Sequence, residues 1–254
     1  MAENVVTIAK DRILTIRMNR PEKKNALTRA MYIAMTEAIL QAEQDPAVRV
    51  ILLAGADNCF TAGNDIADFA AASPGEAPVA IDYLRALAAV EKPVVAAVAG
   101  FAIGIGTTML LHCDLVYAAE TARFQLPFVN LGLCPEAGSS VILPAMMGHH
   151  RAAELLLLGE PFGVDLAREL GLVNRVFDPH ELMSAAVERS HQLAEKPPVS
   201  LRSTKMLLKS GTKEAIAAAL DRETGQFAAL LQGPEAKEAM SAFLERRKPD
   251  FSKF

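Results

Sequence analysis

The longest uncharged run of this chain, from Pro93 to Cys113, places the strongest limit on its fold. A membrane-spanning helix needs about 20 apolar residues, so the run is long enough to cross a bilayer. Its middle is broken by Gly100, Gly104 and Gly106, however, and residues 94–98 form a continuous run of valine and alanine. Such a run is typical of a buried strand. We therefore expect a buried strand followed by a glycine-rich turn, and no membrane span.

Short apolar strands and helices follow one another along most of the chain. A hairpin is predicted at the start, because two alternating runs flank a polar turn. The expected strands cover residues 5–9, 13–18, 50–54, 94–98, 115–117 and 172–177. The first expected helix is capped by Thr28, and its apolar positions Met31, Met35, Ala38 and Ala42 follow helical spacing. Further helices are expected at residues 79–90, 179–194, 199–209, 213–231 and 234–246.

This order predicts an α/β protein whose core spans residues 1–195 and whose C-terminal region, residues 196–254, is helical. Residues 68–78, rich in alanine, proline, serine and glycine, predict a mobile loop. A chain of 254 residues is long enough to bury a large core.

Composition excludes several classes of function. A net charge of −4 gives no electrostatic reason to expect a nucleic-acid partner. Cys59, Cys113 and Cys134 form no Cys-x-x-Cys motif, which fits free thiols in a reducing compartment, and no histidine or cysteine spacing indicates a metal site. The N-terminus has no apolar signal core, and the final residues 252–254 match a peroxisomal signal only loosely, so we expect a cytoplasmic protein.

One carboxylate, Glu136, lies in a run that otherwise has no Asp, Glu, Lys or Arg between Arg123 and Arg151. Pro135 before it and Gly138 after it mark a turn leading into a helix. Two interpretations follow. Glu136 could act as a general base, because desolvation raises the pKa of a carboxyl group toward neutral pH. It could instead occupy the first turn of the helix and stabilise its positive end.

Two further loops carry glycine after an expected strand, at residues 59–66 and 100–108. Such loops allow close approach of a ligand and expose free N–H groups at a helix start. Two of them side by side could direct backbone donors at one developing oxyanion. Neither loop is a dinucleotide fingerprint, and the chain has no phosphate-binding loop and no Gly-x-Ser-x-Gly motif.

Together these segments resemble the crotonase (enoyl-CoA hydratase/isomerase) superfamily over nearly the whole chain. The resemblance is carried by the motifs at residues 19–21 with 25–27, 62–66, 92–98, 113–115, 171–173 and 242–248. It implies a spiral of strand-strand-helix turns with a helical C-terminal trimerisation region, and a homotrimer or hexamer. It also implies an acyl-CoA thioester as substrate, held by the backbone N–H groups of Asn64 and Ile105. No separate cofactor is implied, because coenzyme A is part of the substrate.

Departures from the family pattern narrow the expected reaction. Hydratases of this superfamily carry two catalytic glutamates, at the positions held here by Thr108 and Phe128. The segment from Pro127 to Ser140 instead looks like that of the peroxisomal-type 3-enoyl-CoA to 2-enoyl-CoA isomerases and their bacterial relatives. In those enzymes the glutamate matching Glu136 is the single catalytic acid/base. The resemblance therefore favours isomerisation and disfavours hydration.

Other residues are expected to contact the substrate. Lys24 and Arg20 could bind coenzyme A or be ordinary solvated charges, and Phe243 and Arg246 could reach it from a neighbouring subunit. Asp65 fits a helix cap better than a catalyst. Asp114, at a strand start, is expected to be structural. The full expected set of substrate-binding residues is Lys24, Ala26, Ala62, Asp65, Ile66, Phe128, Phe243 and Arg246.

Two alternatives stay open from the sequence. The chain could catalyse another crotonase-type reaction through the same enolate, on an acyl group unlike a fatty enoyl chain. It could also be a non-catalytic module that binds acyl-CoA or another protein. Product formation from different thioesters distinguishes these alternatives.

Overall fold

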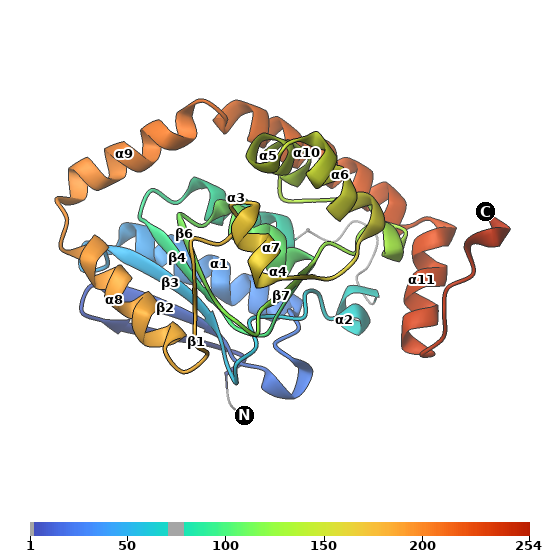
Figure 1. Ribbon diagram of the computed structural model, residues 1–254, viewed down its shortest axis with the longest axis horizontal. Coiled ribbons are helices and arrows are strands. Elements are labelled where there is room, and N and C mark those ends of the chain that lie inside the picture. The colour runs from blue at the N-terminus through green and yellow to red at the C-terminus, as the bar shows by residue number, and fades with distance from the viewer. Residues whose placement is uncertain (1–2, 71–78) are drawn as a thin grey trace.

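The computed structural model describes residues 3–70 and 79–254, and Figure 1 shows the arrangement of their helices and strands. The main sheet has six strands in the order β1-β2-β3-β4-β6-β9. The first two strands pair antiparallel as the expected hairpin, and every later neighbour in this sheet pairs parallel. The strands are β1 (Val5–Lys10), β2 (Ile13–Met18), β3 (Val50–Gly55), β4 (Val94–Val98), β6 (Leu115–Ala119) and β9 (Arg175–Phe177).

Helices cover both faces of the main sheet, because its central strands are apolar on both sides. Along β3, Val50, Leu52 and Ala54 pack in one hydrophobic cluster with helix α8, and Ile51 and Leu53 pack in another with helices α1 and α3. This two-residue alternation is the normal pleat of a strand. It explains why β3 and β4 are apolar at every position, as strands buried on both faces are.

A second, three-stranded sheet was not expected from the sequence. It consists of β5 (Phe101–Ile103), β7 (Arg123–Gln125) and β8 (Phe162–Gly163), in that order. The predicted turn at residues 100–106 therefore contains a strand, which carries the chain from β4 to helix α4.

The helices follow the expected sequence with shifted ends. Thr28 accepts a hydrogen bond from the amide of Met31, as a helix cap does. The strand expected over 172–177 is shortened to β9, and the helix expected from residue 179 begins at Leu182. The α-helices are α1 (Arg29–Gln44), α2 (Ile66–Ala70), α3 (Val79–Ala89), α4 (Ile105–Thr108), α5 (Ser139–Met147), α6 (His149–Leu158), α7 (Val164–Glu169), α8 (Leu182–Ala194), α9 (Pro198–Ser210), α10 (Lys213–Leu231) and α11 (Pro234–Leu244).

Four short 3-10 helices complete the described secondary structure: η1 (Pro21–Lys23), η2 (Met109–His112), η3 (Val129–Leu131) and η4 (Phe251–Lys253). Of the loop predicted over 68–78, residues 68–70 belong to α2, and residues 71–78 lie outside the described part of the chain. No described helix is both long enough and apolar enough to cross a membrane. The C-terminal helices α9, α10 and α11 follow one another in an arc along the outside of the body (Figure 1).

Candidate active site

A cavity of about 540 Å³ lies where the loops after β3 and β5 meet the C-terminal helices. It is lined by both residues whose amides were predicted to form the oxyanion hole, Asn64 and Ile105. The predicted substrate-binding residues in its wall are Ala26, Ala62, Asp65, Ile66, Phe128 and Phe243. Glu136, Lys24 and Arg246 are not part of the wall, so their roles are not explained by this cavity alone.

The loop that carries Asn64 is fixed by backbone hydrogen bonds on both sides of this residue. The Leu27 amide donates to the Gly63 carbonyl at 2.8 Å, and the Asp65 amide donates to the Leu27 carbonyl at 2.9 Å. Among the described residues, the Asn64 amide itself donates to no protein group. Its N–H is therefore available to a ligand in the cavity.

Ile105 offers the second amide for a different reason. It is the first residue of α4, and the first N–H groups of a helix have no carbonyl one turn before them. The preceding residue, Gly104, is held by its own amide, which donates to the Gln125 carbonyl at 2.9 Å.

The two oxyanion loops lie side by side because they exchange backbone hydrogen bonds. The Thr61 amide donates to the Phe101 carbonyl at 2.8 Å, and the Ile103 amide donates to the Thr61 carbonyl at 3.1 Å. Gly106 allows this approach, since a Cβ atom there would lie 2.6 Å from the Cγ2 atom of Thr61. The two loops are therefore neighbours, and the action of their two amides on one oxyanion stays a prediction.

The chain turns sharply directly after Glu136. Ala137 and Gly138 both have positive φ angles, 65° and 70°, and α5 begins at the next residue. The hydroxyl group of Ser139 donates to the Glu136 carbonyl at 2.6 Å. A left-handed conformation is strained for alanine, so this turn needs support from its surroundings.

The Glu136 side chain is buried, with 6% of the residue exposed. Burial raises the pKa of its carboxyl group to about 7; the hydroxyl group of Thr108 donates to Oε1 and lowers it, and the charge of Glu223 raises it further. Since Thr108 ends α4 and Ile105 begins it, the carboxyl group is bonded within one turn of the oxyanion amide, about 5 Å along the helix axis. A carboxyl group with a pKa near 7 suits proton transfer at neutral pH.

Tyr32 binds the side chain of Asn64, a contact that the sequence does not predict. Its hydroxyl group donates to the Asn64 side-chain oxygen at 2.6 Å. Its pKa is raised by burial and by the charge of Glu136. The only signal in the sequence was a tyrosine beside the buried face of α1, since a buried tyrosine hydroxyl normally needs a polar partner.

Asp65 caps α2, as the sequence indicated. Its Oδ1 atom accepts from the amides of Ala67 and Asp68, both at 3.1 Å, and Oδ2 lies 2.6 Å from the Arg20 guanidinium group. This ion pair accounts for Arg20 without a ligand. Lys24 extends its ammonium group over the Phe101 ring, 4.7 Å from the centroid, a geometry typical of cation–π contact.

The position of Phe243 differs from the expectation that it reaches the site from a neighbouring subunit. It lies on α11 and lines the cavity of its own chain, together with Met240 and Leu244. Arg246 follows α11 in a left-handed conformation, with φ 56°, and is exposed. The contact of either residue with coenzyme A remains a prediction.

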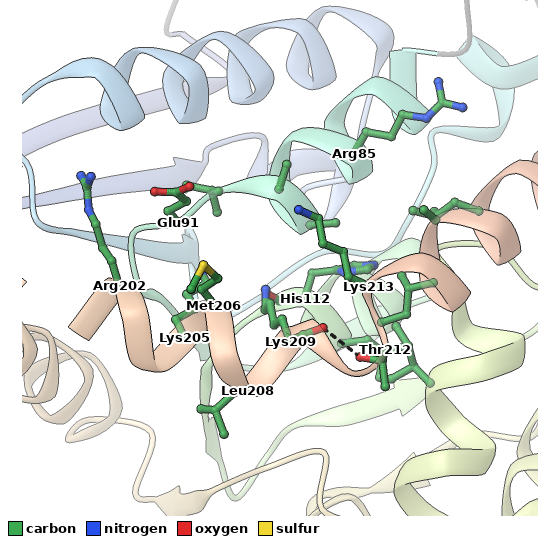
Figure 2. Close-up of a pocket in the computed structure, with 18 of the residues that line it drawn as sticks. Arg85, Glu91, His112, Arg202, Lys205, Met206, Leu208, Lys209, Thr212 and Lys213 are labelled. Carbon is green, nitrogen blue, oxygen red and sulfur yellow. Dashed lines mark hydrogen bonds between the residues drawn. The ribbon is translucent and has the colours of Figure 1, made fainter. Parts of the chain in front are cut away.

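A second cavity, of about 630 Å³, lies between α3 and the helices α9 and α10 (Figure 2). Several of its basic side chains already have partners. Arg85 pairs with Asp221 at 2.9 Å, and Lys209 donates to the His112 carbonyl at 3.3 Å. None of the predicted site residues lines it. The described residues also contain no group of three or more histidine, cysteine, aspartate or glutamate side chains that could hold a metal ion.

Comparison with known proteins gives a consistent result. Residues 9–253 match the family described as "Enoyl-CoA hydratase/isomerase". A "1,2-epoxyphenylacetyl-CoA isomerase" of Escherichia coli K12 is 33% identical, covering 99% of both chains. A "Crotonyl-CoA hydratase" of Syntrophomonas wolfei is also 33% identical, covering 98% of both.

Two further similarities bear on the reaction and the fold. An "Enoyl-CoA delta isomerase 2" of Rattus norvegicus is 34% identical over 97% of this chain and 64% of the rat protein. The crystal structure of an enoyl-CoA hydratase/isomerase from Pseudoalteromonas atlantica superposes with a TM-score of 0.93, at 40% identity over 98% of this chain and all of that one. Names of hydratases and of isomerases therefore occur at equal similarity.

Proposed function

Because the chain belongs to the enoyl-CoA hydratase/isomerase family, and so to the enzymes of the crotonase superfamily, we propose that it isomerises 3-enoyl-CoA to 2-trans-enoyl-CoA in fatty acid degradation. The observation that carries this proposal is the buried carboxyl group of Glu136, which accepts a hydrogen bond from Thr108. Thr108 and Phe128 occupy the two positions where hydratases of the family carry glutamates.

The reaction removes a proton from C2 of the thioester and returns one to C4. The C2 proton is acidic only when the oxygen of the resulting enolate is stabilised, and the amides of Asn64 and Ile105 are suited to that role. Glu136 takes the C2 proton as its carboxylate, and the resulting carboxylic acid donates a proton to C4, so the enzyme ends in its starting state.

The acidic residue that does line the cavity, Asp65, does not serve as a second base. Asp65 lines the cavity, but its oxygens are engaged by Arg20 and by the start of α2. Addition of water across the double bond uses two carboxylates around one water molecule in the hydratases. At the second of those positions, Phe128 gives the cavity an apolar wall instead. We therefore expect double-bond migration without hydration.

The test follows the ultraviolet absorbance of the conjugated enoyl thioester formed from 3-hexenoyl-CoA. Wild type should form the 2-enoyl product, and Glu136→Gln should lower turnover by roughly 10²- to 10⁴-fold, as loss of a positioned acid/base does. Thioester affinity should change little, because the glutamine keeps the shape of the side chain. Near-normal turnover of Glu136→Gln would exclude Glu136 as the base.

Two other outcomes separate the alternatives. Binding of the thioester without product from either protein supports a non-catalytic module or another enolate reaction. Another enolate reaction is supported if the protein turns over thioesters with an acyl group unlike a fatty enoyl chain but does not turn over 3-hexenoyl-CoA. The "1,2-epoxyphenylacetyl-CoA isomerase" of Escherichia coli makes an aromatic thioester the first such compound to test.

A further inference from the structure

We propose that Glu223, on helix α10, is a positioning residue for Glu136, so that packing of α10 onto the body completes the active site. This inference rests on the proposed role of Glu136. Glu223 does not line the cavity, and it acts through the backbone that follows Glu136.

Glu223 is buried, with 7% of the residue exposed, and both of its carboxylate oxygens are used. Oε2 accepts from the Gly138 amide at 2.6 Å, and Oε1 accepts from the Ser140 amide at 2.9 Å. The carboxylate therefore caps the N-terminus of α5 from another helix, where a negative charge also interacts favourably with the helix dipole. Gly138 permits this packing, since a Cβ there would lie 3.1 Å from the Ile216 side chain.

The strained turn between Glu136 and α5 is held from its other side by His112. The Nε2 atom of His112 lies 2.8 Å from the Ala137 carbonyl oxygen. A carbonyl oxygen can only accept, so Nε2 carries the proton. Burial lowers the pKa of His112 to about 4, and the ring is therefore neutral at pH 7. Glu223 and His112 together fix the two left-handed residues that direct the Glu136 side chain.

Figure 2 shows His112 beside Lys209 in the wall of the second cavity. Lys209 lies on α9 and donates to the carbonyl of His112, the residue that binds the Ala137 carbonyl. Helix α9 therefore contacts this turn through His112, in addition to α10 through Glu223. The position of Glu136 therefore depends on the C-terminal helices, although these helices are far from it in the sequence.

Glu223 also contributes charge. Thr108 donates to the Glu136 carboxyl group, whereas the charge of Glu223 raises the pKa of Glu136. Burial raises the pKa of Tyr32 and of Cys134, so both are neutral at pH 7. The titratable and polar groups around Glu136, taken from each element packed against it, are Tyr32 of α1, Thr108 of α4, His112 of η2, Cys134 of its own loop and Glu223 of α10.

The test compares Glu223→Gln with Glu214→Gln, a control at an exposed glutamate on the same helix. Glutamine has one oxygen acceptor, so Glu223→Gln loses one capping bond and the negative charge. We expect kcat for 3-hexenoyl-CoA to fall roughly 10- to 100-fold, as small misplacements of catalytic groups cause. We expect the acidic limb of the kcat/KM profile to move to lower pH, because the charge that raises the pKa of Glu136 is gone. The control should change neither.

A purely structural role predicts a different result, in which kcat and the melting temperature fall but the midpoint of the acidic limb stays in place. That result, or an unchanged kcat, would overturn the proposal. If Glu223→Gln does not fold, Glu223→Asp takes its place. It keeps the charge and shortens the reach toward the Gly138 amide, so kcat should fall while KM and the melting temperature stay close to those of wild type. An unchanged kcat, or a fall in kcat that only accompanies a fall in melting temperature, would overturn the proposal.

Failure of the proposed function is recognised separately. If wild type does not act on 3-hexenoyl-CoA, an infrared pH titration still measures the carboxyl band that disappears in Glu136→Gln. A lower midpoint of this band in Glu223→Gln supports the inference without any turnover. An unchanged midpoint refutes it.

Discussion

At the scale of single residues, burial raises the pKa of Glu136 and the Thr108 hydrogen bond opposes this rise, so both should affect the pH dependence of the proposed reaction. Glu136 accepts the C2 proton only as a carboxylate, so kcat/KM should fall as the pH drops through about 7. Thr108→Val removes the donor that stabilises the carboxylate and should shift the acidic limb to higher pH. The kcat/KM profile of the variant on 3-hexenoyl-CoA measures this shift. A limb that stays in place would mean that Thr108 does not control the pKa of Glu136.

The burial of the Glu136 carboxyl group should lower the free energy of unfolding at neutral and alkaline pH. The pKa of Glu136 rises from 4.5 to about 7 on folding, so the folded state binds more protons than the unfolded chain between these values. The free energy of unfolding therefore falls as the pH rises through this window, by about 3 kcal/mol at ~1.4 kcal/mol per pKa unit. Glu136→Gln removes this loss. Urea unfolding should show the variant more stable than wild type at pH 8, with a difference that shrinks toward pH 4.5. A constant difference would contradict the assignment.

The sequence predicted roles for Glu136 and for the amides of Asn64 and Ile105, but not the groups that contact Glu136 and its turn. Glu136 was noticed because it is a lone carboxylate between a proline and a glycine, a local pattern. The donor Thr108 is 28 residues from Glu136, and the acceptor Glu223 is 85 residues from Gly138, whose amide it binds. No local periodicity records such contacts, because they arise only when α4 and α10 pack around the same turn.

At the scale of elements, the turn into α5 depends on glycine at position 138. Gly138 has φ 70°, and an added Cβ would lie 3.1 Å from the Ile216 side chain. Gly138→Ala should lower the free energy of unfolding by at least about 1–2 kcal/mol, and it should lower kcat because the turn carries Glu136. The matched control is Gly225→Ala, inside α10 with open space around it, which should raise stability by about 1 kcal/mol. Urea unfolding measures the stability of both variants, and turnover of 3-hexenoyl-CoA measures their kcat. Equal effects at the two glycines would exclude a special role for the backbone conformation and packing of Gly138.

Long elements were predictable and short ones were not. The hairpin of β1 and β2, the apolar strands β3 and β4, and the helix α1 all give several periods of an apolar pattern. The strands β5, β7 and β8 have only two or three residues each, fewer than the pattern needs, and β5 lies in a segment that reads as a glycine turn. These strands pair with partners that are distant in the sequence, and a local pattern does not record such contacts.

At the scale of the whole molecule, α9 is attached by an ion pair between the buried Lys205 and the partly buried Asp114, while other residues of α9 are exposed. The Lys205 ammonium group lies 2.7 Å from Asp114 and donates to the Lys92 carbonyl at 2.7 Å, which joins the arc of C-terminal helices to the start of β6. Asp114 also accepts from the Val94 amide at 2.8 Å, so its expected structural role is confirmed. Lys205→Met leaves Asp114 without its cation and should destabilise the protein by about 1–3 kcal/mol, measured by urea unfolding, because Asp114 is partly exposed and keeps its bond to the Val94 amide. Asp114→Asn with Lys205→Met should recover part of this loss; no recovery would mean that the pair is not the cause.

The outer side of α9 exposes apolar residues that a lone chain would leave in water. Leu207 is 67% exposed and Leu208 is 79% exposed, and Figure 1 shows α9 at the edge of the molecule. Adjacent exposed leucines mark an interaction surface. We therefore propose the homotrimer or hexamer expected from the sequence, with α9 in the interface. Light scattering should give a multiple of 27.2 kDa for wild type. Replacing both Leu207 and Leu208 by glutamate should give a monomer. The control Leu40→Glu, at an exposed leucine of α1, should leave the oligomer intact.

The monomer also tests whether one chain holds a complete site. Asn64, Ile105 and Phe243 line one cavity within a single chain, and Glu223 supports Glu136 from the same chain. The monomeric variant should therefore retain isomerase activity per chain within a factor of about ten, because these residues all belong to one chain. Turnover of 3-hexenoyl-CoA, with circular dichroism as the check of folding, measures this. A folded but inactive monomer would show that the neighbouring subunit supplies part of the site, and a monomeric wild type would contradict the interface itself.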